Sequence, residues 1–302
     1  MGRVHQVVRL ANLRWPTPQP AAGTLFLREA PLVRKGIGHD AAVLLSPDDV
    51  APLDVQGRDG RSPFFIVCDH AGRVIPRSLT ALGLSEDELA SHIAWDVGAA
   101  GVAQRLGAAL GAHTVLQRYS RLVIDCNRPL AAADSIVTRS ERTRVPGNQN
   151  VGPGAADERA REIFHPYHDE IRTALDQREA AGLPTVLVAM HSFTPVFMDA
   201  ARPWHVGVLY NRDARLARPL LEALRGEGDL VVGENEPYAA GELTDYSIVQ
   251  HGERRGLPHV EIEIRQDLIA EGRGQDAWAE RLARLLPAAI AAFPASTTPP
   301  SR

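Results

Sequence analysis

The chain has 302 residues, of which 44% are hydrophobic and 23% charged, and its formal net charge is −4. This balance is ordinary for a soluble globular protein, and a chain of this length can bury a sizeable core. No basic face is evident, so we do not expect nucleic acid as a partner. Lys35 is the only lysine, which excludes a Walker-type phosphate loop and a Schiff base anywhere else.

The cysteines and the apolar runs bear on the compartment. Cys68 and Cys126 are the only cysteines, too few for the disulfide framework of a secreted protein. No apolar run reaches the ~18 residues of a membrane span, and the N-terminus lacks the apolar region of a signal peptide. The sequence therefore predicts a cytoplasmic protein without membrane contact, and no pattern in it indicates an oligomeric state.

Composition divides the chain into three parts. Residues 1–58 are rich in Pro, Arg and Gly, and we expect an irregular N-terminal extension there. Residues 59–294 contain neither an internal repeat nor a linker, so they predict a single domain. Residues 295–302, ASTTPPSR, are expected to form a frayed tail.

Three short apolar runs without helical spacing predict buried strands, and each leads into polar side chains. The runs and the polar residues that they deliver are 63–68 with Asp69 and His70, 122–126 with Asp125, Asn127 and Arg128, and 185–190 with His191 and Ser192. In open α/β sheets, ligands bind at the carboxyl ends of the strands. The three runs therefore indicate one shared crevice.

A helical pattern begins after the first of these runs. Ser85–Glu88 has the sequence of a capping box, and the pattern continues to about Leu110 with a possible break near Gly98. Within this predicted helix, His92 and Asp96 are four residues apart. They are therefore expected to share one helix face.

The remaining predicted elements alternate between strands and helices. They are a strand over 113–117, a long polar loop through residue 154, a helix over 156–180, a strand over 205–210, a helix over 213–225, strands over 230–233 and within LPHVEIEIRQDL (257–268), and a helix over 275–292. This order predicts a three-layer α/β/α sandwich around a mixed, largely parallel central sheet.

His70 and His191 are candidate metal ligands, because each follows its own apolar strand. A catalytic zinc takes three nitrogen or oxygen ligands and leaves a fourth position open. The spacing leaves the third ligand open among Asp96, His92 and Asp69. Strand alternation points Asp69 away from His70. The alternative for each histidine is a hydrogen-bonded structural residue.

Two further groups could serve a hydrolytic site. Asn127 and Arg128 could hold a carboxylate, with Arg121 nearby, unless Arg128 pairs with a surface acid. Glu261 and Glu263 are two residues apart and share one face of their strand. Beside a metal, one of them could act as a general base, whereas a solvated edge strand is the alternative.

Seven segments, in this order, resemble the N-formylglutamate amidohydrolase family. They are CDHAGRVIP, HIAWDVGA, RYSRLVIDCNRP, HSFTPV, RPWHVGVLY, NEPY and EIEIRQDL. The resemblance covers residues 63–290 and leaves the N-terminal extension outside. It implies an architecture similar to that of zinc carboxypeptidases and aspartoacylases.

The resemblance implies a zinc ion held by His70 and His191. The wider group places a glutamate ligand three residues after the first histidine, where this chain has Arg73. The departure leaves Asp96 as the inferred third ligand, with His92 in reserve. These assignments follow from the resemblance and not from spacing.

The same resemblance implies the remaining roles. Arg121 is expected to polarise the scissile carbonyl, and Glu263 to act as the general base. Asn127 and Arg128 are expected to grip the carboxylate of the substrate amino acid. The implied roles require a carbonyl and a carboxylate in one small molecule, so the expected partner is a small N-acyl amino acid.

The implied reaction is metal-dependent hydrolysis of N-formylglutamate to formate and glutamate, as at the end of histidine degradation. A second cation would have to meet the side-chain carboxylate, and Arg139 or Arg202 is expected there. One alternative is the same chemistry on another N-acyl amino acid or a short peptide. Another is a non-catalytic binding protein that has lost the metal, because Arg73 replaces the expected glutamate.

Overall fold

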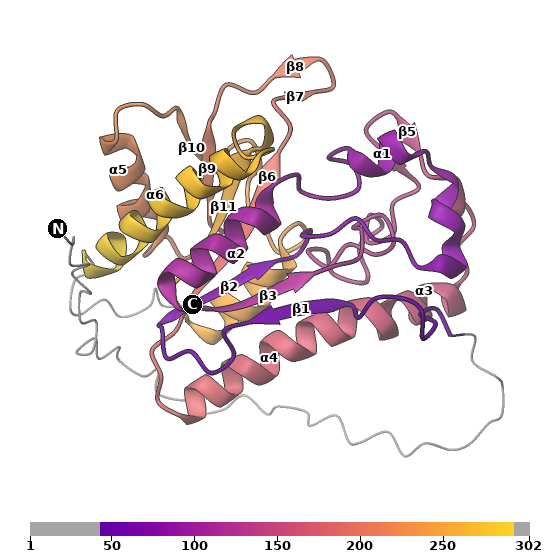
Figure 1. The fold of residues 1–302 in the computed structure, drawn as a ribbon, viewed down its shortest axis with the longest axis horizontal. Helices are drawn as coiled ribbons and strands as arrows, with labels where there is room; N and C mark the ends of the chain where they lie inside the picture. The colour runs from indigo at the N-terminus through magenta and orange to yellow at the C-terminus, as the bar shows by residue number, and fades with distance from the viewer. Residues whose placement is uncertain (1–42, 293–302) are drawn as a thin grey trace.

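A seven-stranded mixed sheet forms the centre of the computed structural model, which describes residues 43–292 (Figure 1). The strand order is β1-β3-β2-β6-β11-β9-β10. The strands are β1 (Leu53–Gln56), β2 (Phe64–Cys68), β3 (His113–Gln117), β6 (Val186–Phe193), β9 (Val206–Leu209), β10 (Val232–Glu234) and β11 (His259–Arg265). Helices flank the sheet, which confirms the predicted fold class.

The four central strands β3, β2, β6 and β11 run parallel to one another. At one side β1 is antiparallel to β3, and at the other β9 is antiparallel to β11 while β10 runs parallel to β9. The carboxyl ends of the central strands therefore meet at a single edge of the sheet. Polar residues that follow these strands are brought together there.

The helices cover the two faces of the sheet (Figure 1). On one face lie α2 (Ala99–Leu110), α5 (Ala217–Gly226) and α6 (Gly272–Ala291), and on the other lie α3 (Pro153–Arg159) and α4 (His165–Ala180), joined by a π-helical turn. The buried core is split in the same way, because alternate residues of each strand face opposite sides. In β2, Phe64 and Ile66 belong to the first cluster, and Phe65 and Val67 to the second.

Short elements complete the described chain. They are α1 (Glu86–Ala90), the hairpins β4 (Arg139–Ser140) with β5 (Thr143–Arg144) and β7 (Val196–Phe197) with β8 (Ala200–Ala201), and a π-helical turn at Ile248–Gly252. A kinked segment of short helical turns spans Arg77–Gly83, and single helical turns lie at Pro146–Asn148, Glu253–Arg255 and Gln266–Leu268. None of the described helices combines the length and the apolar composition needed to cross a membrane.

The predicted helix over 85–110 is broken near Gly98, as its pattern allowed, but the break is longer than expected and spans residues 91–98. The capping box at Ser85 is present, but α1 ends at Ala90 and α2 begins only at Ala99. Gly98 precedes α2 with φ = 81°, and a Cβ there would lie 2.1 Å from the carbonyl oxygen of Ile269. The close approach to a distant segment favours a turn over a continuous helix.

The predicted strand over 122–126 is also wrong, because residues 121–128 form turns. Leu122, Val123 and Ile124 are buried in the second core cluster, which explains their apolar character.

The first strand at the edge of the sheet corrects another prediction. Residues 53–56 were expected to be irregular, yet they form β1 and pair with β3 in the register Leu53↔Gln117. The rest of the predicted extension up to residue 42 and the predicted tail lie outside the described residues.

A buried histidine pair in the second core cluster makes stability depend on pH. In α4, His168 Nδ1 lies 3.0 Å from His251 Nε2, and His168 Nε2 lies 2.9 Å from the carbonyl oxygen of Cys126. Burial lowers the pKa of His168 from 6.5 to about 4, and burial together with His168 lowers the pKa of His251. As the pH falls below 6.5, these two histidines therefore bind protons in the unfolded chain before they do so in the folded chain.

We expect the free energy of unfolding to fall as the pH drops from 6.5 towards 4. His251→Gln keeps an N–H donor for His168 but does not titrate. Between pH 7.5 and 4.5, this variant should lose about 2–3 kcal/mol less stability than the wild type, as linkage for one depressed histidine requires. Urea unfolding at the two pH values measures the difference, and equal losses in both proteins would contradict the prediction.

Candidate metal centre

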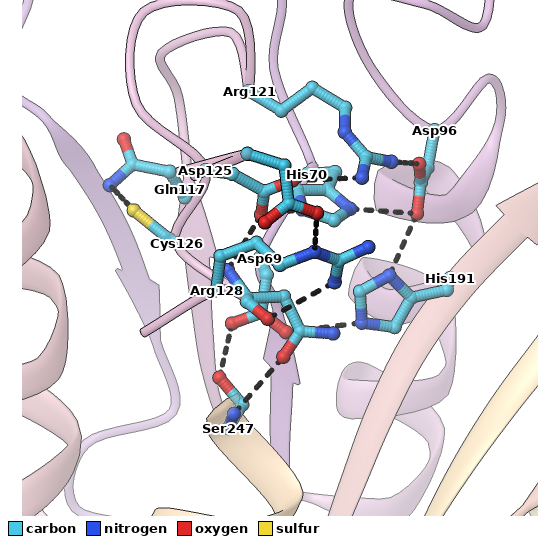
Figure 2. Close-up of polar contacts among 12 residues, drawn as sticks. Asp69, His70, Asp96, Gln117, Arg121, Asp125, Cys126, Arg128, His191 and Ser247 are labelled. Atoms are coloured by element: carbon cyan, nitrogen blue, oxygen red, sulfur yellow. Dashed lines mark hydrogen bonds and ion pairs between the residues drawn. The ribbon is translucent and has the colours of Figure 1, made fainter. Parts of the chain in front are cut away.

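The polar residues that follow the central strands gather at the carboxyl edge of the sheet (Figure 2). β2 ends at Cys68, so Asp69 and His70 lie in the turn that follows it, and His191 lies near the end of β6. The turn before α2 supplies Asp96, whose backbone N–H donates to the carbonyl oxygen of His70 over 3.0 Å. Segments far apart in the chain thus supply one cluster.

His70, Asp96 and His191 form a buried group of donor atoms that all lie within 4.8 Å of one another. We call this group the donor triad. Oδ2 of Asp96 lies 2.8 Å from His191 Nδ1 and 3.4 Å from His70 Nδ1. The two rings are edge to face with centroids 5.0 Å apart. Two imidazole nitrogens and a carboxylate oxygen are a donor set that suits a divalent ion such as zinc.

The outer ring nitrogen of each histidine faces a carboxylate of its own. His70 Nε2 lies 2.7 Å from Asp125 Oδ1, and His191 Nε2 lies 3.1 Å from Asp69 Oδ2. Metal-binding histidines commonly donate their second N–H to a carboxylate, which fixes the tautomer and the ring orientation. Both Nδ1 atoms therefore remain available on the side of Asp96. This arrangement fits a bound divalent metal.

Asp69 and Asp125 extend the sequence-based interpretation. Alternation predicted that Asp69 points away from His70, and no hydrogen bond joins these two residues within residues 43–292. The sequence did not indicate that the Asp69 carboxylate instead joins the cluster through His191. Asp125 was not assigned a role. Its position four residues after Arg121 was the available signal, because the Arg121 guanidinium donates to its Oδ2 over 2.8 Å.

The three carboxylates of the cluster stay ionised because each faces positively charged neighbours. Burial alone would raise the pKa of Asp125, but Arg121 and His70 hold it well below its usual range. Burial likewise opposes ionisation of Asp96, and the two histidines outweigh it and lower its pKa. The pKa of Asp69 is also lowered. Burial alone would raise it, but the hydrogen bond and the charge of His191 outweigh burial. Burial would lower the pKa of His70 and of His191, but the surrounding carboxylates raise both, so Arg121 and two protonated imidazoles balance the three carboxylates. A divalent ion held there would take the place of the imidazole protons on the side of Asp96.

His92, the reserve ligand, lies outside the donor triad. Its Nε2 is 3.1 Å from Glu141 Oε2 on the β4–β5 hairpin, and its side chain is 26% exposed. The helical spacing that joined His92 to Asp96 does not exist, because residues 91–98 form turns. Of the open choices for a third donor, the structure brings Asp96 to the two histidine Nδ1 atoms.

Glu261 and Glu263 share a face of β11, but that face is buried. They are 2% and 5% exposed, and Oε2 of each lacks a hydrogen-bond partner among the described residues. Glu263 lies opposite His191 in the register of β11 and β6, and both carboxylates lie within 4.8 Å of a His191 donor atom. Burial raises the pKa of Glu263 to about 7. The solvated-edge alternative is therefore wrong.

Arg121 and Arg128 lie in the same region (Figure 2), and Asn127 immediately precedes Arg128 in the chain. Arg121 donates to Asp96 Oδ1 over 3.5 Å as well as to Asp125, and its side chain is 27% exposed. The Asn127 Oδ1 atom accepts from a backbone N–H. Arg128 Nε donates to Asp134 Oδ2 over 3.0 Å, which is the acid pairing considered as an alternative.

The two arginines expected at the substrate side chain differ in position. Arg139 lies on β4, and its guanidinium donates to the carbonyl oxygen of Arg142; no contact of Arg139 within residues 43–292 reaches the donor triad. Arg202 donates to the Tyr238 hydroxyl over 2.9 Å and stacks on aromatic rings. The pKa of Tyr238 is raised by burial and then by the charge of Glu263.

The fold and the cluster define a class: an α/β protein with a buried His/Asp/His candidate metal site at the carboxyl edge of its parallel strands. Residues 62–270 match the family model described as N-formylglutamate amidohydrolase. The chain therefore belongs to the N-formylglutamate amidohydrolase family. This confirms the resemblance drawn from the seven sequence segments.

Two solved structures are similar to the chain. The gene product Atu2144 from Agrobacterium tumefaciens is 36% identical with a TM-score of 0.80, and the match covers 82% of this chain and 98% of that one. N-formylglutamate amidohydrolase from Ralstonia eutropha JMP134 is 17% identical with a TM-score of 0.57, covering 80% and 98%. The second likeness supports the fold alone. No sequence among curated proteins matches the chain.

Proposed function

We propose that this protein is a metal-dependent amidohydrolase that cleaves the amide bond of an N-acyl amino acid, with N-formylglutamate as the first candidate. The observation that carries the proposal is the donor triad, in which each histidine is backed by its own carboxylate. Family membership supports amide hydrolysis. The products would be formate and glutamate, which would place a cytoplasmic enzyme at the end of histidine degradation.

His70, Asp96 and His191 are the residues that would hold the metal, which we propose to be a single zinc ion. Zinc held there would supply a Lewis acid that lowers the pKa of water and polarises a carbonyl. The residues fit this group, because the donor atoms are buried nitrogens and an oxygen within 4.8 Å of one another. The nearby carboxylate oxygens without partners also favour a cation.

The protein's own side chains would handle the proton and the developing charge. Glu263 Oε2 has no protein partner among the described residues, so it can accept a proton from the attacking water and pass it to the leaving amine. Arg121, which is held by Asp96 and Asp125, would stabilise the oxyanion at the acyl carbon.

Asn127 and Arg128 would bind the carboxylate of the amino acid, and we call this pair the carboxylate anchor. Asn127 Nδ2 and Arg128 Nη2 have no hydrogen-bond partner within residues 43–292, so both retain donors for a ligand. Arg202 is the cation that we propose for a second carboxylate, as in glutamate, because it contacts Tyr238, whose pKa is raised by burial and then by Glu263. Arg139 remains a proposal without a contact to the cluster.

The test of the proposed function is hydrolysis by the purified protein with a measured zinc content. We expect release of formate and glutamate in equal amounts from N-formylglutamate, loss of activity on chelation, and recovery with added zinc. N-acetylaspartate and short peptides distinguish the alternative substrates. A folded protein that holds no zinc would overturn the proposal, whereas a zinc-loaded protein inactive on every substrate would favour a binding protein.

The binding-protein alternative arises because Arg73 occupies the position at which the wider group has a glutamate metal ligand. The Arg73 guanidinium lies over the Trp95 ring, 5.9 Å from its centroid, while Asp96 supplies a carboxylate beside the two histidines. The substitution at Arg73 therefore does not remove the third oxygen donor from the cluster. This geometry favours catalysis over loss of the metal.

Arg128→Lys tests the carboxylate anchor. A lysine ammonium is a point charge and cannot reproduce the two-pronged geometry of a guanidinium on a carboxylate. We expect the KM for N-formylglutamate to rise roughly tenfold or more, with a smaller change in kcat, because the lost contact is made before the reaction. Arg172→Lys on the exposed side of α4 is the matched control. An unchanged KM in Arg128→Lys would remove the anchor.

A further inference from the structure

Ser247 lies beside the cluster and belongs to none of the roles assigned so far. It immediately precedes the π-helical turn Ile248–Gly252 and is fully buried. Its hydroxyl donates to Asp69 Oδ1, and its backbone N–H donates to Asn127 Oδ1 over 3.0 Å (Figure 2). One residue thus contacts both sides of the proposed site.

The Ser247 hydroxyl, which we call its hydroxyl arm, contacts Asp69 and through it His191, on the side of the proposed metal. Asp69 offers one oxygen to Ser247 and the other to His191 Nε2. A carboxylate held at both oxygens cannot rotate about its terminal bond, so its orientation towards the imidazole is fixed. Asp69 also acts on the buried hydroxyl of Tyr167, whose pKa is raised by burial first and then by Asp69. Among the described residues, the Ser247 hydroxyl is the one that donates to Asp69 with the distance and angles of a hydrogen bond.

The Ser247 backbone N–H, which we call its backbone arm, contacts Asn127 of the carboxylate anchor. An asparagine amide can be flipped, and its hydrogen-bond partners decide which end faces which way. Because the Ser247 N–H requires an acceptor, it holds Oδ1 of Asn127 and leaves Nδ2 as the free end. The neighbouring N–H of Tyr246 donates to the Asn127 carbonyl oxygen over 3.1 Å and keeps the two segments in register.

The segment that carries Ser247 is itself held in place. The Asp245 carboxylate accepts from the Gly241 N–H over 2.8 Å and from the Thr244 hydroxyl over 2.6 Å. The carbonyl oxygen of Thr244 in turn accepts from Arg128. A turn braced in this way delivers Ser247 to a defined position, so both of its arms act from a fixed point.

We propose that Ser247 is a positioning residue that ties the carboxylate anchor to the Asp69–His191 pair. The inference rests on the proposed function, since it assigns His191 to the metal and Asn127 to the substrate. The two arms can be separated by substitution. Ser247→Ala removes the hydroxyl arm and keeps the backbone arm, so its effect should fall on the metal side alone.

The test compares Ser247→Ala, Ser247→Thr and wild type in two measurements, with a control that removes another buried hydroxyl. The first measurement is the zinc dissociation constant by chelator competition without substrate, and the second is the KM for N-formylglutamate. We expect Ser247→Ala to weaken zinc binding ~10-fold, the lower range for groups that orient a metal ligand, and to leave KM within about twofold. Ser247→Thr keeps a hydroxyl and should restore zinc affinity. Thr114→Val, at the start of β3, should change neither value.

Several results would overturn the inference. They are wild-type zinc affinity in Ser247→Ala, failure of Ser247→Thr to restore it, or an equal loss in Thr114→Val. Failure of the proposed function looks different. If the wild type binds zinc but hydrolyses nothing, the proposed function fails, and the zinc dissociation constants still test the role of Ser247. If the wild type binds no zinc, both the proposed function and the inference about Ser247 are wrong.

Discussion

Glu263→Gln should lower kcat by ~10² or more, the range typical for loss of acid–base help, while zinc stays bound. Glutamine matches glutamate in size and hydrogen-bonding reach but cannot take a proton from water. Because Glu263 Oε2 has no partner among the described residues, the substitution breaks no internal hydrogen bond of that atom. The loss should therefore fall on kcat, with KM nearly unchanged.

Glu261→Gln is the matched control for this prediction. Both carboxylates are buried on the same face of β11, so both substitutions make the same change in the same surroundings. Glu263 lies opposite His191 at the end of β6, whereas Glu261 lies opposite Ala189, two residues further from that end. We expect the control to retain most of its kcat. If Glu261→Gln is the damaging change, the assignment of the general base on this strand is wrong.

The sequence predicted the parts of the site that stand on regular strands. A central strand covered on both faces is a continuous apolar run, and such runs located β2 and β6 and the polar residues after them. β11 was located by its alternating pattern. The burial of Glu261 and Glu263 was not predictable, because the same alternation describes a strand with one face in water.

The irregular connections were the parts that periodicity could not place. The run before Asn127 is apolar because it is buried, and burial alone does not distinguish a packed turn from a strand. The spacing of His92 and Asp96 suited a helix, but the close approach of Gly98 to Ile269 turns the chain between α1 and α2. Contacts such as His70 with Asp125, 55 residues apart, depend on these turns.

The edge of the sheet was missed for a different reason. β1 has only four residues, and all of them are partly exposed. Leu53 and Val55 alternate with polar residues and pack against the second core cluster, but two apolar residues are too short a pattern to predict a strand. A short edge strand after a Pro- and Gly-rich segment therefore resembles an irregular extension.

Asp96→Asn should abolish tight zinc binding, weakening it by more than ~100-fold, since groups that merely orient a ligand already account for 10- to 100-fold. The Asp96 carboxylate is the only oxygen donor of the triad, and it faces the Nδ1 atoms of both histidines. Asparagine keeps the shape but loses the charge. His92→Ala is the control, because His92 contacts Glu141 away from the triad.

Thermal unfolding gives a second readout that does not depend on activity. A ligand that binds only the folded state stabilises it by about 2.7 kcal/mol at 100 times its dissociation constant. Wild type and His92→Ala should therefore unfold at a lower temperature after chelation, because both bind zinc. Asp96→Asn should show no such change, since it holds no zinc to lose. If instead His92→Ala loses both zinc and the shift, the third ligand is His92, and the route through residues 91–98 differs from the one described.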